Sequence, residues 1–135
     1  MAEAATLVSK TTASIGTTDF TVSIRAGHHA WICDEHAVLG GKDAGPAPFD
    51  LLLGSLGACT AITLRMYAKR KDWPLEAVDV DLRYLKTSDT PRIERFLTLK
   101  GALSDEQRAR LADIAERTPV TLAIKDGVPV RTELR

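Results

Sequence analysis

The feature that most constrains this chain is an uncharged stretch, Leu51 to Ala61, within a helix predicted from about Pro48 to about Lys71. Apolar side chains recur through this region at mixed three- and four-residue spacings, which is typical of a helix. The stretch is also rich in glycine, serine, alanine and threonine, which let neighbouring backbones approach closely. We therefore expect a central helix whose first half is buried on all sides.

The segments on either side of this helix are typical of strands and shorter helices. Residues Ala5 to Glu35 alternate and favour strand formers, which predicts three antiparallel strands. A loop rich in Gly and Pro, residues 40–48, then leads into the central helix. The later predicted elements are strands 78–86 and 92–101, a helix 105–117 opened by a capping box of Ser104 and Gln107, a short helix starting at Thr118-Pro119 and ending near Gly127, and a final strand 128–134. Apolar residues of strand 92–101 fall at 93 and 96 and then at 97 and 99, which allows for a slip in register.

This order of elements predicts an α+β protein rather than an alternating βαβ one. A length of 135 residues favours a single domain, residues 1–135. One sheet and two short helices are too little to cover the small-residue surface of the central helix, and a second chain would cover the remainder. We therefore expect a homodimer in which each chain's sheet wraps the other chain's central helix.

Charge and composition exclude several kinds of partner. Eighteen basic residues balance eighteen acidic ones, so no overall field draws the protein to nucleic acid or to anionic lipid. The first ten residues lack the pattern of a signal peptide, and no window approaches the eighteen or so apolar residues of a membrane span. We expect a cytoplasmic protein that binds neither nucleic acid nor membrane.

Two cysteines, Cys33 and Cys59, are too few for a disulfide scaffold and lack the spacing of a zinc site. Free thiols fit a reducing compartment. The histidines His28, His29 and His36 lie close together in the chain, but adjacent residues of a strand point to opposite faces. We therefore expect no metal site and no cofactor.

The run from Gly40 to Thr60, GGKDAGPAPFDLLLGSLGACT, resembles the OsmC/Ohr family (osmotically inducible protein C and organic hydroperoxide resistance) in its loop, its helix and its cysteine. Residues Asp72 to Val80 and Ile114 to Val120 also look like this family, so the resemblance extends over roughly residues 20 to 134. It is strongest to the OsmC-like subgroup. The resemblance implies an intertwined homodimer with two active sites at its interface, in agreement with the dimer expected from composition.

The resemblance implies thiol-dependent reduction of organic hydroperoxides in the oxidative-stress response, with Cys59 as the peroxidatic nucleophile. A thiolate is the nucleophile in such chemistry, and a neighbouring guanidinium favours it. The family's resolving cysteine immediately precedes the Pro-Val pair of the third helix, where this chain has Thr118. Because a hydroxyl cannot form a disulfide, an external thiol would have to recycle Cys59.

The resemblance also implies an acid and an arginine that assist the thiol. The family's glutamate directly follows the proline before the helix, whereas here Phe49 stands there and the acid is Asp50. Asp50 could equally be a surface acid matched to the helix dipole. Arg25 is the one arginine before the loop and is the candidate, although it could be a solvent-facing strand charge. Cys33 is expected to be a buried core thiol.

Two other functions remain open. The chain could be a non-catalytic OsmC-like module that binds a small molecule and keeps Cys59 for packing, and the missing resolving cysteine favours this alternative. A hydrolase with Cys59 and a histidine base is the third possibility, but all three histidines precede the central helix and nothing in the sequence brings them to Cys59.

Overall fold

The computed structural model describes residues 4–135. These residues divide into two compact units, with the boundary between Leu51 and Leu52, early in the helix α1. The elements, in chain order, are β1 (Thr12–Ile15), β2 (Val22–Ala26), β3 (His29–Cys33), the short 3-10 helix η1 (Ala37–Leu39), α1 (Pro48–Arg70), β4 (Ala77–Leu85), β5 (Arg92–Lys100), α2 (Asp105–Ala115) and α3 (Pro119–Asp126). The two sheets and the long helix confirm the predicted α+β class.

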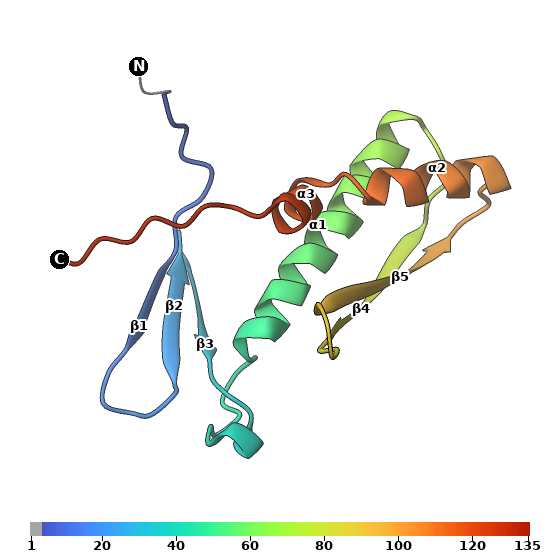
Figure 1. The fold of residues 1–135 in the computed structure, drawn as a ribbon. Helices are drawn as coiled ribbons and strands as arrows, with labels where there is room; N and C mark the ends of the chain where they lie inside the picture. Colours follow the sequence, from blue (N-terminus) through green and yellow to red (C-terminus); the bar gives the residue numbers. More distant parts are fainter. Residues whose placement is uncertain (1–3) are drawn as a thin grey trace. The chain divides into compact units, whose positions relative to one another are not determined.

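The N-terminal unit is built on an antiparallel sheet of three strands in the order β1-β2-β3 (Figure 1). Thr12 pairs with Arg25, and Ile24 pairs with Trp31. Ile24 and Cys33 are the buried apolar residues of these strands. The three predicted antiparallel strands are therefore confirmed, with shorter bounds than the alternation suggested.

A buried carboxylate, that of Asp34, organises the loop between β3 and α1. Its oxygens accept hydrogen bonds from the backbone N–H groups of Glu35 (2.7 Å), Lys42 (3.2 Å) and Ala44 (3.2 Å). Burial alone would raise the pKa of Asp34, but the N–H groups of Ala44, Glu35 and Lys42, together with the Thr21 side chain, bring it below its ordinary value. The loop thus closes around a stable negative charge.

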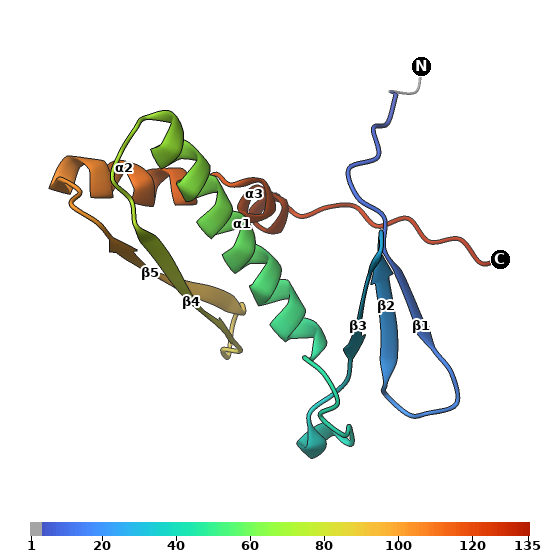
Figure 2. The same ribbon diagram turned by 180° about the vertical axis from the view of Figure 1, so that it is seen from behind.

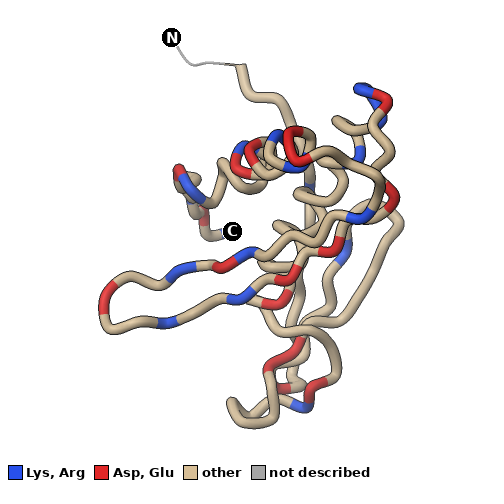
Figure 3. The backbone as a smooth tube through the Cα atoms, turned by 90° about the vertical axis from the view of Figure 1, so that its right-hand side faces the viewer, with Lys and Arg blue, Asp and Glu red and all other residues tan. Residues whose placement is uncertain are grey.

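The C-terminal unit packs its hairpin and its second helix against one side of α1 (Figure 2). Their common core consists of Leu64 and Ala68 of α1, Leu75, and Leu111 and Ala115 of α2. Gly57 lets the hairpin approach α1, because an added Cβ would lie 2.8 Å from the Leu82 methyl Cδ1. Acidic and basic positions are interspersed along the hairpin (Figure 3).

The pairing of β4 with β5 is regular along its length, so the slip allowed for near Phe96 does not occur. Val80 pairs with Leu97, Leu82 with Arg95, and Tyr84 with Ile93. Phe96 therefore lies on the opposite face and is 51% exposed. Arg95 takes an inward position between Ile93 and Leu97.

The single chain buries only one side of α1, in agreement with the expectation that one chain cannot cover this helix alone. Its buried residues, Leu56, Thr60, Leu64 and Ala68, recur every four positions and form one stripe. Phe49, Ile62 and Met66 remain exposed, because the hairpin and the short helices cover only that stripe. By length and composition alone α1 is also long and apolar enough to cross a membrane, contrary to our expectation; the core helix of a soluble protein passes the same test.

The last two helices follow the sequence pattern, whereas the final strand does not form. Ser104 and Gln107 make the expected capping box at the start of α2, with bonds of 3.1 Å and 2.9 Å. Beyond α3, residues 128–135 adopt no regular structure, and Val128, Val130 and Leu134 are exposed. A strand needs a neighbour for its N–H and C=O groups, and no strand of residues 4–135 pairs with this segment.

Candidate functional site

Cys59 lies in the middle of α1 and is half-buried. The backbone N–H of Val120, the second residue of α3, donates to its sulfur at 3.5 Å. A hydrogen bond to sulfur from an N–H stabilises a thiolate more than a thiol, because the acceptor then carries a full charge. The structure thus brings the predicted nucleophile to the first turn of α3.

Thr118, at the position of the family's resolving cysteine, is the N-cap residue of α3 and is fully buried. Its side chain caps no backbone N–H. Instead its Oγ1 lies 2.6 Å from Oγ1 of Thr121, and either hydroxyl can be the donor. Thr118 and Cys59 therefore belong to the two segments that meet at the contact between Val120 and the sulfur.

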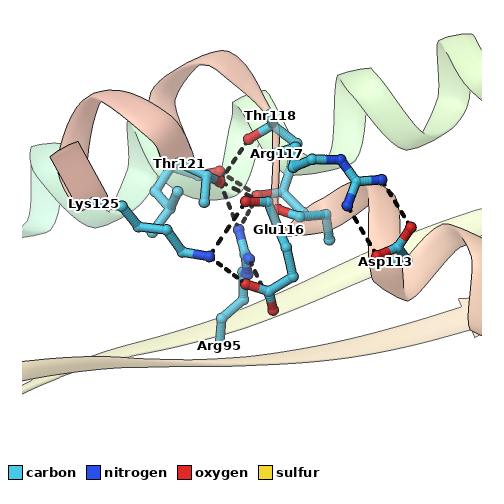
Figure 4. A network of polar contacts seen from close by, with 10 residues as sticks. Arg95, Asp113, Glu116, Arg117, Thr118, Thr121 and Lys125 are labelled. Atoms are coloured by element: carbon cyan, nitrogen blue, oxygen red, sulfur yellow. Dashed lines mark hydrogen bonds and ion pairs between the residues drawn. The ribbon is translucent and has the colours of Figure 1, made fainter.

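An arginine that sequence analysis did not single out, Arg95 of β5, lies beside this contact. Its Nη1 donates to Oγ1 of Thr60 at 3.0 Å and to Oγ1 of Thr121 at 2.9 Å. Its Nη2 lies 3.8 Å from Glu116 Oε1, and its side chain is only 12% exposed. Figure 4 shows Arg95 extending from the strand toward the start of α3.

Arg95, Thr60, Thr121 and Glu116 form a polar cluster. At its edge, Glu116 lies between two cations. Lys125 Nζ is 2.6 Å from its Oε2, and Arg95 is on its other oxygen. The hydrogen bond from Lys125, with a smaller contribution from the charge of Arg95, holds the pKa of Glu116 below its ordinary value. The cluster is therefore ionic at neutral pH.

A pocket of about 390 Å³ opens next to the cluster, within the range typical of small-molecule sites. Its walls combine apolar and charged side chains from the hairpin, α1, α3 and the segment before α3: Leu56, Tyr84, Pro91, Arg92, Ile93, Arg95, Glu116, Thr121, Ile124 and Lys125. Cys59 is not one of these residues. Arg95 and Thr121 line the pocket, and they are bonded to each other next to the segments that carry Cys59 and Val120.

Asp50 is engaged by the loop that precedes α1. Its Oδ2 accepts a hydrogen bond from the Ala47 N–H at 2.9 Å and lies 3.8 Å from His36 Nε2. An acid at the third helical position that bonds the N–H just before the helix is a helix-capping arrangement. Asp50 belongs to the N-terminal unit, whereas Cys59 belongs to the C-terminal unit. The surface-acid alternative accounts for the contacts that Asp50 makes in this chain.

Arg25 and Cys33 both belong to the N-terminal unit. Arg25 lies in β2, opposite Thr12 and Ala30, and is exposed. Cys33 ends β3 and is buried, as expected for a core thiol. Burial, followed by the charges of Glu35, Asp34 and Asp50, raises the pKa of the Cys33 thiol. These surroundings disfavour the reactive thiolate at Cys33.

The three histidines do not form a metal site. His28 belongs to the turn before β3 and not to the strand, so the alternation of strand side chains does not apply to it, and the rings of His28 and His29 lie with their centroids 4.1 Å apart. Among residues 4–135, no group of three or more His, Cys, Asp or Glu side chains is arranged to hold a metal ion.

The signal that could have identified Arg95 is the strict alternation of β5. With a period of two, position 95 falls on the same face as Ile93, Leu97 and Leu99. A charged residue on an apolar face needs a partner, because burying an unpaired charge is costly. The run of Phe96 and Leu97 obscured this alternation.

Comparison with known proteins supports the family resemblance. The family described as OsmC-like protein matches residues 40–133 of the chain. An OsmC-like protein from Mycoplasma pneumoniae is similar in structure, with a TM-score of 0.75, 16% identity and 88% of each chain covered. No curated protein gives a match to the sequence.

Two solved structures named for hydroperoxide resistance are also similar. For the organic hydroperoxide resistance protein OhrB of Bacillus subtilis the TM-score is 0.62, with 22% identity over 96% of this chain and 98% of that one. For the organic hydroperoxide resistance protein OsmC from Legionella pneumophila the TM-score is 0.64, with 19% identity over 90% and 92%. At these identities the likeness shows the fold. Since the family match spans α1, the hairpin and the last two helices, the chain belongs to the OsmC-like protein family.

Proposed function

We propose that this protein reduces organic hydroperoxides with Cys59 as the peroxidatic nucleophile and an external thiol as the reductant. The observation that carries the proposal is the hydrogen bond from the Val120 N–H to the Cys59 sulfur, at 3.5 Å. It supplies the thiol with a donor that favours the thiolate. Family membership and the names of the similar structures support the same chemistry.

In the proposed reaction, the Cys59 thiolate attacks the terminal oxygen of the hydroperoxide and the O–O bond breaks. The sulfur becomes a sulfenic acid, and the organic part leaves as an alcohol after taking a proton. Because Thr118 cannot form a disulfide, an external thiol condenses with the sulfenic acid and releases water. A second thiol then restores Cys59 and leaves as a disulfide with the first.

The pocket beside Arg95 and Thr121 is proposed to receive the organic part of the peroxide. Its apolar side chains, Leu56, Ile93 and Ile124 among them, suit a hydrocarbon group. We further propose, from the resemblance alone, that Arg25 and Asp50 assist the thiol at an active site formed between two copies. Arg25→Ala and Asp50→Ala should then lower peroxide turnover and leave folding intact.

We propose that residues 1–135 act as one domain of a cytoplasmic homodimer. Phe49, Ile62 and Met66 on α1 and the alternating apolar residues of 128–134 are exposed in the single chain, and a second copy could cover both. Light scattering at micromolar protein should give the mass of a dimer. A well-folded monomer at that concentration would contradict this proposal.

The test of the activity is a thiol assay. The purified protein is treated with an organic hydroperoxide, sulfenic acid is trapped, and the labelled residue is located by mass spectrometry. Rapid labelling of Cys59, absent in Cys59→Ser and retained in Cys33→Ser, supports a peroxidase. An inert Cys59 in folded protein contradicts it.

A second test uses the position of the missing resolving cysteine. If Thr118 lies within reach of Cys59, Thr118→Cys should form an internal disulfide on peroxide treatment and should resist inactivation by excess peroxide. Wild type should lose activity progressively unless thiol is present. A folded Thr118→Cys protein with neither a new disulfide nor faster peroxide consumption counts against the pairing.

The alternative function is a small-molecule-binding module without catalysis. It is favoured by the pocket itself, which has the size of a ligand site and does not include Cys59 in its walls. Isothermal titration with small amphipathic compounds, in wild type and Cys59→Ser, separates the two functions. Equal binding by both proteins together with an inert Cys59 would favour the module.

A further inference from the structure

The contacts of Arg95 connect the two segments that meet at the Cys59 sulfur. One acceptor of its guanidinium, Thr60, directly follows Cys59 in α1. The other, Thr121, directly follows Val120, whose N–H donates to that sulfur. Both acceptors are bound by the same nitrogen, Nη1, at 3.0 Å and 2.9 Å. A single buried group therefore spans the joint between α1 and the start of α3.

The helix α3 depends on contacts of this kind for its position. With eight residues it is shorter than an isolated helix that is stable in water, so tertiary contacts must place it. Thr121 is 4% exposed and Thr60 is fully buried, so these hydroxyl groups have no ready exchange with water. The guanidinium is planar and rigid, and it fixes the distance between its two acceptors better than an ammonium could.

We propose that Arg95 is a positioning residue that sets the reactivity of Cys59 by holding the Val120 N–H against its sulfur. In this role Arg95 acts through its hydrogen bonds to Thr60 and Thr121 and not through a bond to the sulfur. The proposal deepens the proposed function, since it rests on Cys59 being the reacting thiol. It concerns the thiol itself, however, and it can be tested without any peroxide.

The experiment measures the rate of Cys59 alkylation by iodoacetamide as a function of pH, read by mass spectrometry of the Cys59 peptide. At about pH 7, Arg95→Ala should react roughly five- to tenfold more slowly than wild type, because a hydrogen bond to the thiolate is weakened. Its profile should move to higher pH and meet that of wild type in strong alkali, where every thiol is ionised. Arg95→Lys keeps the positive charge but lacks the planar guanidinium, so its alkylation rate should lie between those of wild type and Arg95→Ala.

Controls separate positioning from a general loss of structure. Arg83→Ala removes an exposed arginine from the same hairpin and should leave the profile unchanged. An Arg95→Ala protein with wild-type circular dichroism and melting but a superimposable profile would overturn the proposal. So would faster alkylation at every pH, which indicates exposure of the thiol rather than loss of a donor.

A second pair of variants serves if Arg95→Ala does not fold. Thr60→Val keeps the β-branched shape but removes the hydroxyl acceptor, and it should move the profile in the same direction by a smaller amount, whereas Thr60→Ser keeps the hydroxyl and should not. Identical profiles for this pair would refute the role of Arg95. Peroxide consumption is measured separately: alkylation that depends on Arg95 without any turnover contradicts the proposed function and leaves the positioning role standing.

Discussion

Asp34 in the N-terminal unit and Arg95 in the C-terminal unit are both largely buried charged residues, but they are satisfied in different ways. Most partners of Asp34 are backbone N–H groups from one to ten residues away in the chain, and the Thr21 side chain is a further partner. The acceptors of Arg95 are side-chain hydroxyl groups 35 and 26 residues away. Asp34 therefore organises one loop, whereas Arg95 joins elements that are distant in sequence.

The two residues also differ in what their removal would leave behind. The three N–H groups on Asp34 lie in a turned loop where that carboxylate is the acceptor. Around Arg95, Thr60 also bonds the Leu56 carbonyl at 2.7 Å, and Thr121 also bonds Thr118 at 2.6 Å. A buried donor left without an acceptor costs far more than a pair that is lost together. The fold should therefore depend on Asp34, while Arg95 is free to serve function.

The largest effect should follow from Asp34→Ala. Three backbone N–H groups lose their acceptor at once, and we expect the melting temperature to fall by about 10 °C or more. Asp34→Asn, which keeps one acceptor oxygen, should lose less. Differential scanning calorimetry of both variants measures this. A melting temperature within a few degrees of wild type for Asp34→Ala would contradict the claim that the fold depends on Asp34.

Gly41→Ala should be the next most harmful change, since it acts on the same loop. An added Cβ would lie 2.0 Å from the Glu35 carbonyl oxygen, so the backbone would have to move. We expect a loss of about 2–3 kcal/mol in the free energy of unfolding, measured by urea denaturation. Gly16→Ala is the matched control, because an added Cβ there meets nothing within 4 Å. Equal losses for both variants would contradict the steric argument.

The contribution of Asp34 should also depend on pH. Because its pKa is lower in the folded protein than its ordinary value of about 3.9, its stabilisation is complete above that value and is lost as the pH falls through the folded pKa. The gap in stability between wild type and Asp34→Ala should be constant near neutral pH and should narrow below about pH 4. Denaturation curves at several pH values give this gap. If the gap widened in acid, the pKa of Asp34 would be raised by folding and not lowered, which would contradict this prediction.

Arg95→Met should have the smallest effect on stability, within about 1 kcal/mol, since its partners keep other hydrogen bonds and the methionine fills the apolar position. Urea denaturation measures it. The comparison would fail if Arg95→Met cost as much as Asp34→Ala. The comparison would be strengthened if Arg95→Met kept its stability while Cys59 alkylation slowed. Asp34 would then serve the fold, and Arg95 would serve the site.

The sequence was most informative where local rules decide the structure. The capping box of Ser104 and Gln107, the start of α3 at Thr118-Pro119 and the three early strands depend on neighbours in the chain, and all of them form. For Asp50 the sequence left two alternatives open, an acid that assists the thiol and a surface acid at the start of the helix. The exposed side of α1 was expected from its composition, whereas the unpaired state of segment 128–134 could not be predicted, because a strand depends on the neighbour that pairs with it.

The amino-acid sequence alone determined the α+β class, the family, the reactive candidate Cys59 and the absence of a thiol at position 118, because residue types and local spacing are sufficient for these. Only the tertiary structure decided that Val120 donates to the Cys59 sulfur and that Arg95 faces inward to join α1 with α3. The physical reason is that the register of β5 and the docking of α3 depend on packing between segments far apart in the chain, which no local pattern specifies.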